Sequence, residues 1–422
     1  MGKSNQALLA ATEPCLILGP AVLGPNWERQ RDLWTPDLDA FFVSYSSVCE
    51  RLPDANGRMS QVGERPKAEF RRHWGTVICD EAHYLKGRKT KWTQAVSKLS
   101  TDNLFLLTGT PVPNWAHEIY MLLKLIGPEG VDLNSYWRWV ERYFVTYTGP
   151  GGKGRKIGKK KREVPWERFV TENRLDELML RRTEQESWSD RPPLWGVDED
   201  SFLPTDDGII EVEMVPAQRR LYKELKKNYL AWMPSGEEVS AWSGGGLHTK
   251  LAQVSTGLEV LDPSSKGSGK LDMLEELVED RPGMPLLIPC KFRGTVREVA
   301  GRLRAMGREV TTILGGDSRG SGEAAARFQA GEGDCLVATL DTISTGLDLY
   351  RASTVIFVER SWRPDVNKQT IKRLHRMGQE HPVTVITLET QGTVDANIGR
   401  ALGDKTEQQM EMLSAQAFAS ML

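Results

Sequence analysis

The chain has 422 residues, of which 39% are hydrophobic and 27% are charged, and its formal net charge is -2. This length predicts roughly two to three folding units of ordinary globular composition. No apolar run approaches the ~20 residues needed to cross a bilayer, so no membrane partner is predicted and an intracellular location is expected, in the cytoplasm or nucleoid or in a eukaryotic nucleus. Because the whole chain is slightly acidic, binding to a polyanion would require a local basic patch.

The first segment, residues 1–127, alternates helical patterns with short apolar runs. These runs are predicted strands at residues 15–18, 41–44, 77–79 and 104–107. Short buried strands separated by helices indicate a parallel sheet that is covered on both faces. The segment is therefore predicted to be one α/β lobe.

The strand signal fades in residues 128–268, which we predict to be a helical insertion and linker. A basic, glycine-rich stretch at residues 148–162 is predicted to be a loop. This loop is either simply solvated or an electrostatic grip on nucleic acid, and the sequence leaves both readings open.

The alternation resumes in residues 269–398, which form the second predicted α/β lobe. Its strands are expected at residues 286–288, 310–314, 336–338, 355–358 and 383–388, with helices at residues 295–306, 322–329 and 366–377. Residues 399–422 are predicted to be a C-terminal helix. The predicted fold class is thus α/β, with two parallel-sheet lobes and a helical insertion between them.

Two carboxylates, Asp80 and Glu81, follow the predicted strand 77–79 directly. Ligands of open α/β sheets bind at the carboxyl ends of the strands. In a phosphoanhydride-cleaving site the first carboxylate would hold Mg²⁺ and the second would orient or deprotonate the attacking water. The alternative is a helix start that merely favours acidic residues.

Two further clusters follow. Thr108, Gly109 and Thr110 end the predicted strand 104–107, where they could contact neighbouring site loops or form an ordinary turn. Gln369, Arg373 and Arg376 have the spacing i, i+4 and i+7, which places them on one face of a helix. Such arginines can reach a γ-phosphate, although a solvated basic stripe has the same pattern.

The segments DEAHYLKG at residues 80–87 and LLTGTPVPN at 106–114 resemble motifs II and III of superfamily-two helicase-like ATPases of the Swi/Snf type, which are double-stranded-DNA translocases. QTIKRLHRMGQ at 369–379 resembles motif VI, and STGLDL at 344–349 resembles motif V, except that the family more often has Asn at the position of Asp348. The resemblance implies two RecA-like lobes of the P-loop NTPase fold and a DNA-dependent ATPase that uses ATP and Mg²⁺.

The resemblance also implies roles for single residues. Gly2, Lys3 and Ser4 match the end of the phosphate-binding loop, so Lys3 would bind phosphate, and Ser4 and Asp80 would bind Mg²⁺. Gln369, Arg373 and Arg376 would contact the nucleotide, while His83, Thr108, Gly109 and Thr110 would couple hydrolysis to movement. The phosphates of double-stranded DNA, bound with little sequence specificity, would meet Gly19, Pro20, Ser44, Tyr45, Lys291, Arg293, Ser344, Thr345 and Trp362.

A complete phosphate loop follows a strand and has a further glycine, whereas Gly2 alone precedes Lys3 here. The first lobe is therefore expected to lack its P-loop strand, which a missing N-terminal segment or another polypeptide would supply. Two alternatives to the translocase remain: a strand-separating helicase or restriction-system motor subunit, and a catalytically impaired DNA-binding remnant. No oligomer is predicted.

Overall fold

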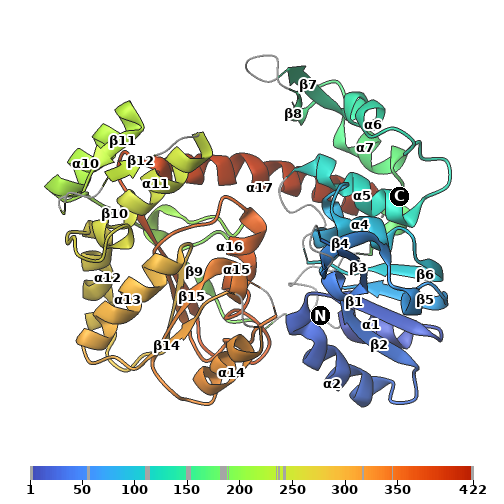
Figure 1. Ribbon diagram of the computed structural model, residues 1–422, viewed down its shortest axis with the longest axis horizontal. Coiled ribbons are helices and arrows are strands. Elements are labelled where there is room, and N and C mark those ends of the chain that lie inside the picture. The colour runs from blue at the N-terminus through green and yellow to red at the C-terminus, as the bar shows by residue number, and fades with distance from the viewer. Residues whose placement is uncertain are drawn as a thin grey trace. The chain divides into compact units, whose positions relative to one another are not determined.

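The computed structural model of the protein describes residues 3–54, 58–109, 115–148, 154–180, 188, 190–233, 235, 238–240, 244–315, 318–344 and 346–419. The chain divides into two units (Figure 1), Met1–Ser187 with Glu407–Leu422 and Trp188–Thr406. The predicted insertion, residues 128–268, is shared between these units. Each unit contains its own parallel sheet, which confirms the predicted α/β fold class.

The sheet of the first unit has four parallel strands in the order β2-β1-β5-β6. In chain order these are β1 (Cys15–Gly19), β2 (Ala40–Ser44), β5 (His73–Cys79) and β6 (Ser100–Leu106). Each contains one of the predicted apolar runs, apart from the last residue of the fourth run. Strands β1 and β5 pair from Cys15 opposite Thr76 to Leu18 opposite Cys79, so their carboxyl ends lie side by side.

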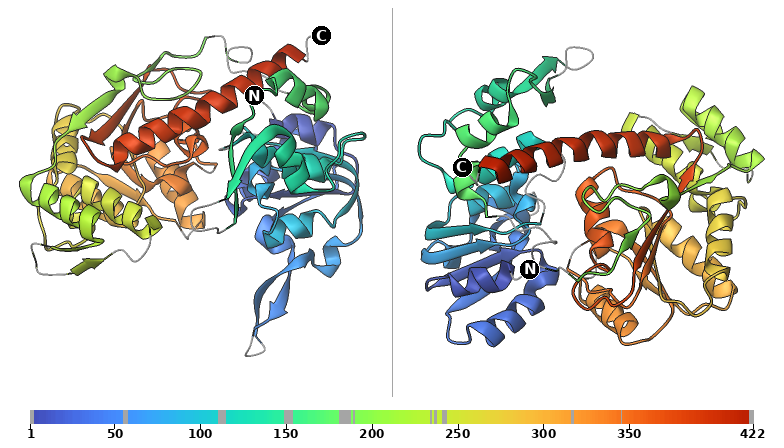
Figure 2. Two further views of the ribbon diagram at one scale, coloured as in Figure 1. Left: turned by 90° about the horizontal axis from the view of Figure 1, so that it is seen from above. Right: turned by 180° about the vertical axis from the view of Figure 1, so that it is seen from behind.

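Helices and hairpins surround this sheet. The helices are α1 (Lys3–Leu9), α2 (Gly24–Trp34), α3 (Tyr45–Val48), α4 (Lys91–Val96), α5 (Tyr120–Ile126), α6 (Tyr136–Tyr143), α7 (Trp166–Glu172) and α8 (Leu175–Leu178), with 3-10 turns η1 (Ala21–Leu23), η2 (Ala68–Phe70), η3 (Ala82–Lys86) and η4 (Ala116–Ile119). Strands β3 (Cys49–Pro53) and β4 (Met59–Pro66) form an antiparallel hairpin that extends away from the parallel sheet (Figure 2).

A second hairpin replaces the loop that we predicted at residues 148–162. Strands β7 (Phe144–Thr148) and β8 (Arg155–Lys160) pair antiparallel. The β-branched and aromatic residues of β7 favour a strand. We predicted a loop because residues 148–162 are rich in glycine. Residues 149–153 lie outside the described part of the chain.

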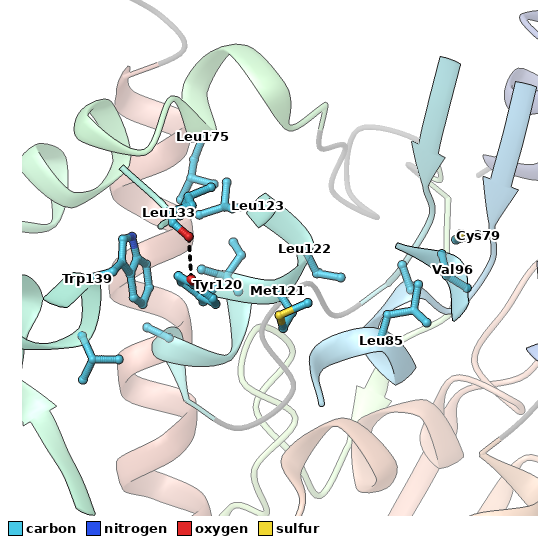
Figure 3. Close-up of a cluster of buried hydrophobic side chains, with 14 of the residues drawn as sticks. Cys79, Leu85, Val96, Tyr120, Met121, Leu122, Leu123, Leu133, Trp139 and Leu175 are labelled. Carbon is cyan, nitrogen blue, oxygen red and sulfur yellow. Dashed lines mark hydrogen bonds between the residues drawn. The ribbon is translucent and has the colours of Figure 1, made fainter. Parts of the chain in front are cut away.

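Buried side chains join the sheet of the first unit to its helical insertion. One cluster extends from Leu16 and Cys79 in the sheet, through Leu85 and Leu123, to Phe169 in α7. Figure 3 shows its middle part, where the Tyr120 hydroxyl donates a hydrogen bond of 2.7 Å to the carbonyl of Leu133. This packing holds the turn η3, which follows the carboxylate pair, through its buried residue Leu85.

The sheet of the second unit has seven parallel strands. Six follow the order β10-β17-β16-β13-β15-β14, and β9 pairs with the start of β17, ahead of the residues that pair with β10. Their bounds are β9 (Leu194–Trp195), β10 (Ile209–Val212), β13 (Leu286–Cys290), β14 (Val310–Ile313), β15 (Cys335–Thr339), β16 (Thr354–Phe357) and β17 (Val383–Thr390). The first two of these strands come from the stretch that we predicted to be a helical insertion.

The helices of the second unit are α10 (Pro216–Asn228), α11 (Gly244–Thr256), α12 (Gly269–Glu279), α13 (Arg293–Ala305), α14 (Ser318–Gln329), α15 (Leu340–Ile343) and α16 (Pro364–Ile371), with the turns η6 (Asp206–Gly208) and η7 (Leu258–Val260). Strands β11 (Leu230–Trp232) and β12 (Glu238–Ser240) form a small hairpin. Helix α17 (Val394–Ala419) begins in this unit, and its residues from Glu407 onward belong to the first. Among the described residues, no helix has both the length and the apolar sequence that crossing a membrane requires.

Candidate nucleotide and nucleic-acid site

Asp80 stands at the carboxyl end of β5, where four contacts hold it. Its backbone N–H donates to the carbonyl of Leu18 over 2.7 Å, and its own carbonyl accepts from the Tyr45 hydroxyl at 2.7 Å. One carboxylate oxygen accepts from Trp27 Nε1 at 2.8 Å, and the other accepts from the N–H of Glu81 at 2.9 Å. The carboxylate is therefore fixed at the sheet edge where the sequence predicted it.

Trp27 is a site residue to which our sequence analysis gave no role at the carboxylates. Its side chain is 1% exposed, and its only polar atom, Nε1, donates a hydrogen bond to Asp80. The two residues are 53 positions apart, so no local pattern connects them. Burial raises the pKa of Asp80, Glu81 adds to the rise, and the hydrogen bond from Trp27 opposes it. Trp27 thus favours the charged form of a carboxylate that burial disfavours.

Glu81 has a left-handed backbone, with φ 49° and ψ 47°, immediately before η3. This conformation is uncommon for a residue other than glycine, and such outliers concentrate at functional sites. The Glu81 carboxylate lies 3.2 Å from Nδ1 of the buried His83, and the same nitrogen lies 3.2 Å from the Thr108 hydroxyl. Of the residues predicted to couple hydrolysis to movement, His83 in motif II and Thr108 in motif III are thus in contact.

The backbone joins the same two motifs. Leu107 donates to the carbonyl of Cys79, and Ala82 donates to the carbonyl of Leu107, both at 2.8 Å. A movement of the segment after β6 would therefore directly displace the turn that carries Glu81. Of the other predicted coupling residues, Gly109 is described, whereas Thr110 lies outside the described residues.

The first described residues of the chain lie beside the segments predicted as motifs II and III. Lys3 opens α1, and a Cβ atom placed on Gly109 would be 3.7 Å from Lys3 Nζ. The Lys3 charge also lowers the pKa of Asp80 slightly, against the effect of burial. Ser4 is half-buried on the first turn of α1, and Gly2 lies outside the described residues.

The residues present fit a magnesium ion with few protein ligands. Each Asp80 oxygen accepts one N–H and retains a second acceptor position, and a nearby cation would favour the charge that burial disfavours. In the described parts of the chain, no group of three or more His, Cys, Asp or Glu residues could hold a metal by itself. This is the pattern of Mg²⁺ held by one carboxylate and by the phosphates of a nucleotide.

In the second unit, Arg373 joins the segments predicted as motifs V and VI. Its Nη2 donates to the carbonyl of Ser344 at 2.6 Å and lies 3.5 Å from the amide oxygen of Gln369. Its carbonyl accepts from the N–H of Leu349 at 3.1 Å. Two predicted site residues, Gln369 and Arg373, are therefore neighbours.

Of Gln369, Arg373 and Arg376 only Gln369 lies in a helix, so our prediction that the three share one helix face is wrong. Helix α16 ends at Ile371, and tight turns carry the chain to Gly378, whose φ of 101° favours glycine. The Arg376 guanidinium instead forms an ion pair with Asp348, the position where the resembled family more often has Asn. Both side chains are partly exposed, at 39% and 49%.

The residues predicted to contact DNA divide into two groups. Arg293 is exposed at the first position of α13, and Pro20, Ser44, Lys291 and Trp362 are half-buried. Gly19, Tyr45 and Ser344 are buried, and Thr345 lies outside the described residues.

Two predicted side-chain contacts are corrected by this burial. The Tyr45 side chain is 2% exposed and its hydroxyl donates to Asp80, so it positions the carboxylate strand. The Ser344 hydroxyl donates to the carbonyl of Asp341 at 3.2 Å. The side chains of Tyr45 and Ser344 therefore already serve contacts within their own units.

Comparison with known proteins agrees with the motif order. Residues 3–257 match the model of the SNF2-related domain, and residues 269–378 match that of the helicase conserved C-terminal domain. The chromodomain-helicase-DNA-binding protein 8 of Danio rerio is 25% identical, over 94% of this chain and 17% of that protein. The ISWI chromatin-remodeling complex ATPase ISW1 of Saccharomyces cerevisiae is 23% identical, over 91% of this chain and 34% of that protein.

The chain therefore spans only about a third of the length of the second relative and less than a fifth of that of the first. Among solved structures, the Sulfolobus solfataricus SWI2/SNF2 ATPase core in complex with dsDNA is 20% identical, covers 100% of this chain and 88% of that chain, and has a TM-score of 0.39.

Proposed function

We propose that this chain, which belongs to the SNF2-related family by the match over residues 3–257, is a DNA-dependent ATPase that couples ATP hydrolysis to movement along double-stranded DNA. Its relatives include a chromatin-remodeling complex ATPase and a chromodomain-helicase-DNA-binding protein. We place this activity inside the cell, where duplex DNA and ATP occur together.

One observation carries the proposal: two adjacent carboxylates at a parallel-sheet edge are held by separate sets of contacts. Trp27 holds Asp80, while His83 lies against Glu81 and is itself in contact with Thr108. Asp80 and Ser4 would hold Mg²⁺, which would neutralise charge on the phosphates of bound ATP. Glu81 would orient the attacking water and accept its proton, and Lys3 would bind phosphate.

The second unit would supply cationic groups to the same nucleotide. Arg373 and Arg376 carry permanent charges, and a guanidinium can bind phosphate oxygens in a bidentate manner. Gln369, beside Arg373, would help to orient it. Arg373 donates to a backbone carbonyl and Arg376 pairs with the partly exposed Asp348, and each could exchange this contact for a phosphate.

DNA would be held through its phosphates. Arg293 and Lys291 offer positive charge at the start of α13, and Pro20, Ser44 and Trp362 are accessible enough to contact a backbone. Contacts of this kind position a duplex without reading its sequence. We therefore expect affinity to depend on salt and little on base sequence.

The test is ATP hydrolysis by the full chain, titrated with duplex DNA and compared between wild type and Glu81→Gln. We expect stimulation by duplex DNA and a fall of about 10² to 10⁴ in kcat for the variant, because a general base is lost. Glu28→Gln, an exposed glutamate beside Trp27, is the matched control and should retain the rate. DNA binding that ignores both ATP and Glu81→Gln would overturn the proposal in favour of a DNA-binding remnant.

A triplex substrate separates translocation from strand separation. A translocase displaces the third strand and leaves the duplex intact, whereas a helicase or a strand-separating motor subunit also releases single strands. Displacement that needs ATP hydrolysis and yields intact duplex is the expected result. Release of both duplex strands would replace the translocase by the alternative motor.

A further inference from the structure

The β7–β8 hairpin carries a strongly basic surface that has no role in the function proposed above. Residues 144–162 include no acidic side chain, in a chain whose net charge is -2. The described basic residues of this segment are Arg155, Lys156, Lys159, Lys160, Lys161 and Arg162. Figure 1 shows the hairpin beside α6 and α7 within the first unit.

The hairpin is attached to the unit at its base, through Phe144, and near its turn, through Arg155. Phe144 is 1% exposed, and its ring centroid lies 5.9 Å from those of both Trp139 and Phe169. Arg155 forms an ion pair with Glu141 at 2.5 Å and lies over the ring of Trp137. The hairpin is therefore a platform fixed to α6 and α7 by packing and charge.

One face of this platform combines a cation with an exposed aromatic ring. Lys156 pairs directly with Tyr147, and directly opposed residues point to the same side of a sheet. Tyr147 is 51% exposed and Val145 is 48% exposed, although both are large hydrophobic residues. A Cβ atom on Gly158 would lie 3.5 Å from the Tyr147 ring. The ring therefore lies next to the glycine, which has no side chain to cover it.

The basic residues of the hairpin do not all serve the protein's own packing. Arg155 is used by Glu141, and Lys160 donates to the carbonyls of Lys161 and Val164 while lying over the Trp166 ring. Lys156 and Arg162, by contrast, are exposed. Lys156 lies opposite the exposed Tyr147 ring, and Arg162 follows the end of β8 directly before Glu163. Exposed cations, one of them beside an exposed ring, fit a polyanion that also offers sugar surfaces.

We propose that the β7–β8 hairpin is a second contact for double-stranded DNA, in which Lys156 and Arg162 meet phosphates and Tyr147 packs against the sugar backbone. The proposal rests on the proposed function, because it assigns this surface to the same duplex on which the motor acts. It deepens that function by adding a grip outside the two α/β sheets. Such a grip would hold the duplex without reading its sequence.

The experiment measures the affinity of the full chain for a duplex of random sequence without nucleotide, over a series of salt concentrations. For the double variant Lys156→Glu with Arg162→Glu we expect affinity to fall on the order of tenfold or more, and the slope of log affinity against log salt to fall by roughly one to two. Tyr147→Ala should lower the affinity and leave this slope unchanged, because it removes no charge.

The matched control reverses the same charge elsewhere. Lys226 and Lys227 are exposed and adjacent in α10, so Lys226→Glu with Lys227→Glu changes the net charge equally. An equal loss in both double variants would overturn the proposal, because net charge alone would then explain it. A loss confined to single-stranded DNA, or equally tight binding of polyglutamate, would also overturn it. Thermal unfolding of each variant establishes that the fold is retained, and the milder Lys156→Gln replaces the reversal if it is not.

These outcomes remain distinct from failure of the proposed function. Affinity is measured without ATP, so a wild-type chain that binds duplex through the hairpin but shows no DNA-stimulated hydrolysis would sink the motor and keep the contact. If the wild-type chain shows DNA-stimulated hydrolysis and the hairpin variant binds duplex as tightly as wild type, the motor is supported and the hairpin contact is overturned.

Discussion

The two units hold their charged site groups in opposite ways. In the first unit, Asp80 is fixed by the buried side chains of Trp27 and Tyr45, which are 1% and 2% exposed. In the second unit, Arg376 is held by Asp348 in a pair whose side chains are 39% and 49% exposed. The first arrangement keeps a carboxylate still, whereas the second can exchange one anionic partner for another.

The energies support this distinction. A hydrogen bond to a charged group contributes about 1.5 to 3 kcal/mol, while an exposed ion pair contributes about 0 to 1 kcal/mol. Arg373 is intermediate, because it donates to the carbonyl of Ser344 and approaches Gln369. If the contrast has this meaning, variants in the two units should fail in different ways.

The largest expected effect comes from Arg373→Ala, which removes the better-held arginine. We expect kcat for DNA-stimulated ATP hydrolysis to fall by about 10³, because a guanidinium that neutralises γ-phosphate charge is lost. Arg373→Lys should restore little, since an ammonium cannot form the same paired contacts. Lys372→Ala is the control, because the ammonium of Lys372 lies near the Phe202 ring and is not assigned to the nucleotide. Equal rates for the two alanine variants would show that Arg373 serves only its contact with Ser344.

Trp27→Phe tests the buried side of the comparison. Losing the N–H that donates to Asp80 should weaken Mg²⁺-dependent hydrolysis by about 10- to 100-fold, as expected for a hydrogen bond to a charged group. Half-saturation by Mg²⁺ should move to a higher concentration, a shift that destabilisation alone does not predict.

Trp74→Phe is the matched control for this variant. Trp74 is also buried, and its Nε1 donates to the carbonyl of Phe70 at 3.1 Å, away from the carboxylates. Both variants should lose similar stability, measured by chemical denaturation, but only Trp27→Phe should change the Mg²⁺ dependence. A shared change would mean that Trp27 merely fills space.

The sequence predicted what depends on local patterns and failed where distant residues meet. The strands that end at Cys79 and Leu106 were predictable, because short apolar runs followed by polar site residues have a clear pattern. The end of α16 at Ile371 was not, since the Arg373 carbonyl is taken by Leu349 from another segment. Burial of Tyr45 was equally hidden, because its partner Asp80 is 35 positions away.

Asp348→Asn tests the exposed side of the comparison. Removing the carboxylate charge should release Arg376 for phosphate and raise the rate of ATP hydrolysis by roughly two- to fivefold, which is the range of an exposed ion pair. The gain should shrink at high salt, where screening already weakens the pair. Asp207→Asn removes an exposed charge from η6 and should leave the rate unchanged. A lower rate in Asp348→Asn would show that the pair orients Arg376 for catalysis.

The smallest expected effect concerns stability. It sharpens the contrast between a half-buried histidine in the first unit and an exposed one in the second. Burial lowers the pKa of His117 from its ordinary value of 6.5, and its ring packs edge-on against Phe144 at 5.8 Å. The folded state therefore disfavours the protonated ring. The stability that this histidine contributes is fully present above pH 6.5 and is lost as the pH falls through the lowered pKa.

His117→Gln should consequently lose less stability than wild type between about pH 7.5 and pH 5.5, by less than about 1 kcal/mol. Chemical denaturation at each pH measures the difference. His381→Gln is the control, because His381 is exposed in the second unit, and its profile should follow that of wild type. Parallel profiles of stability against pH for all three proteins would show that His117 gains a proton as easily in the folded chain as in the unfolded one. Burial would then not distinguish His117 from His381.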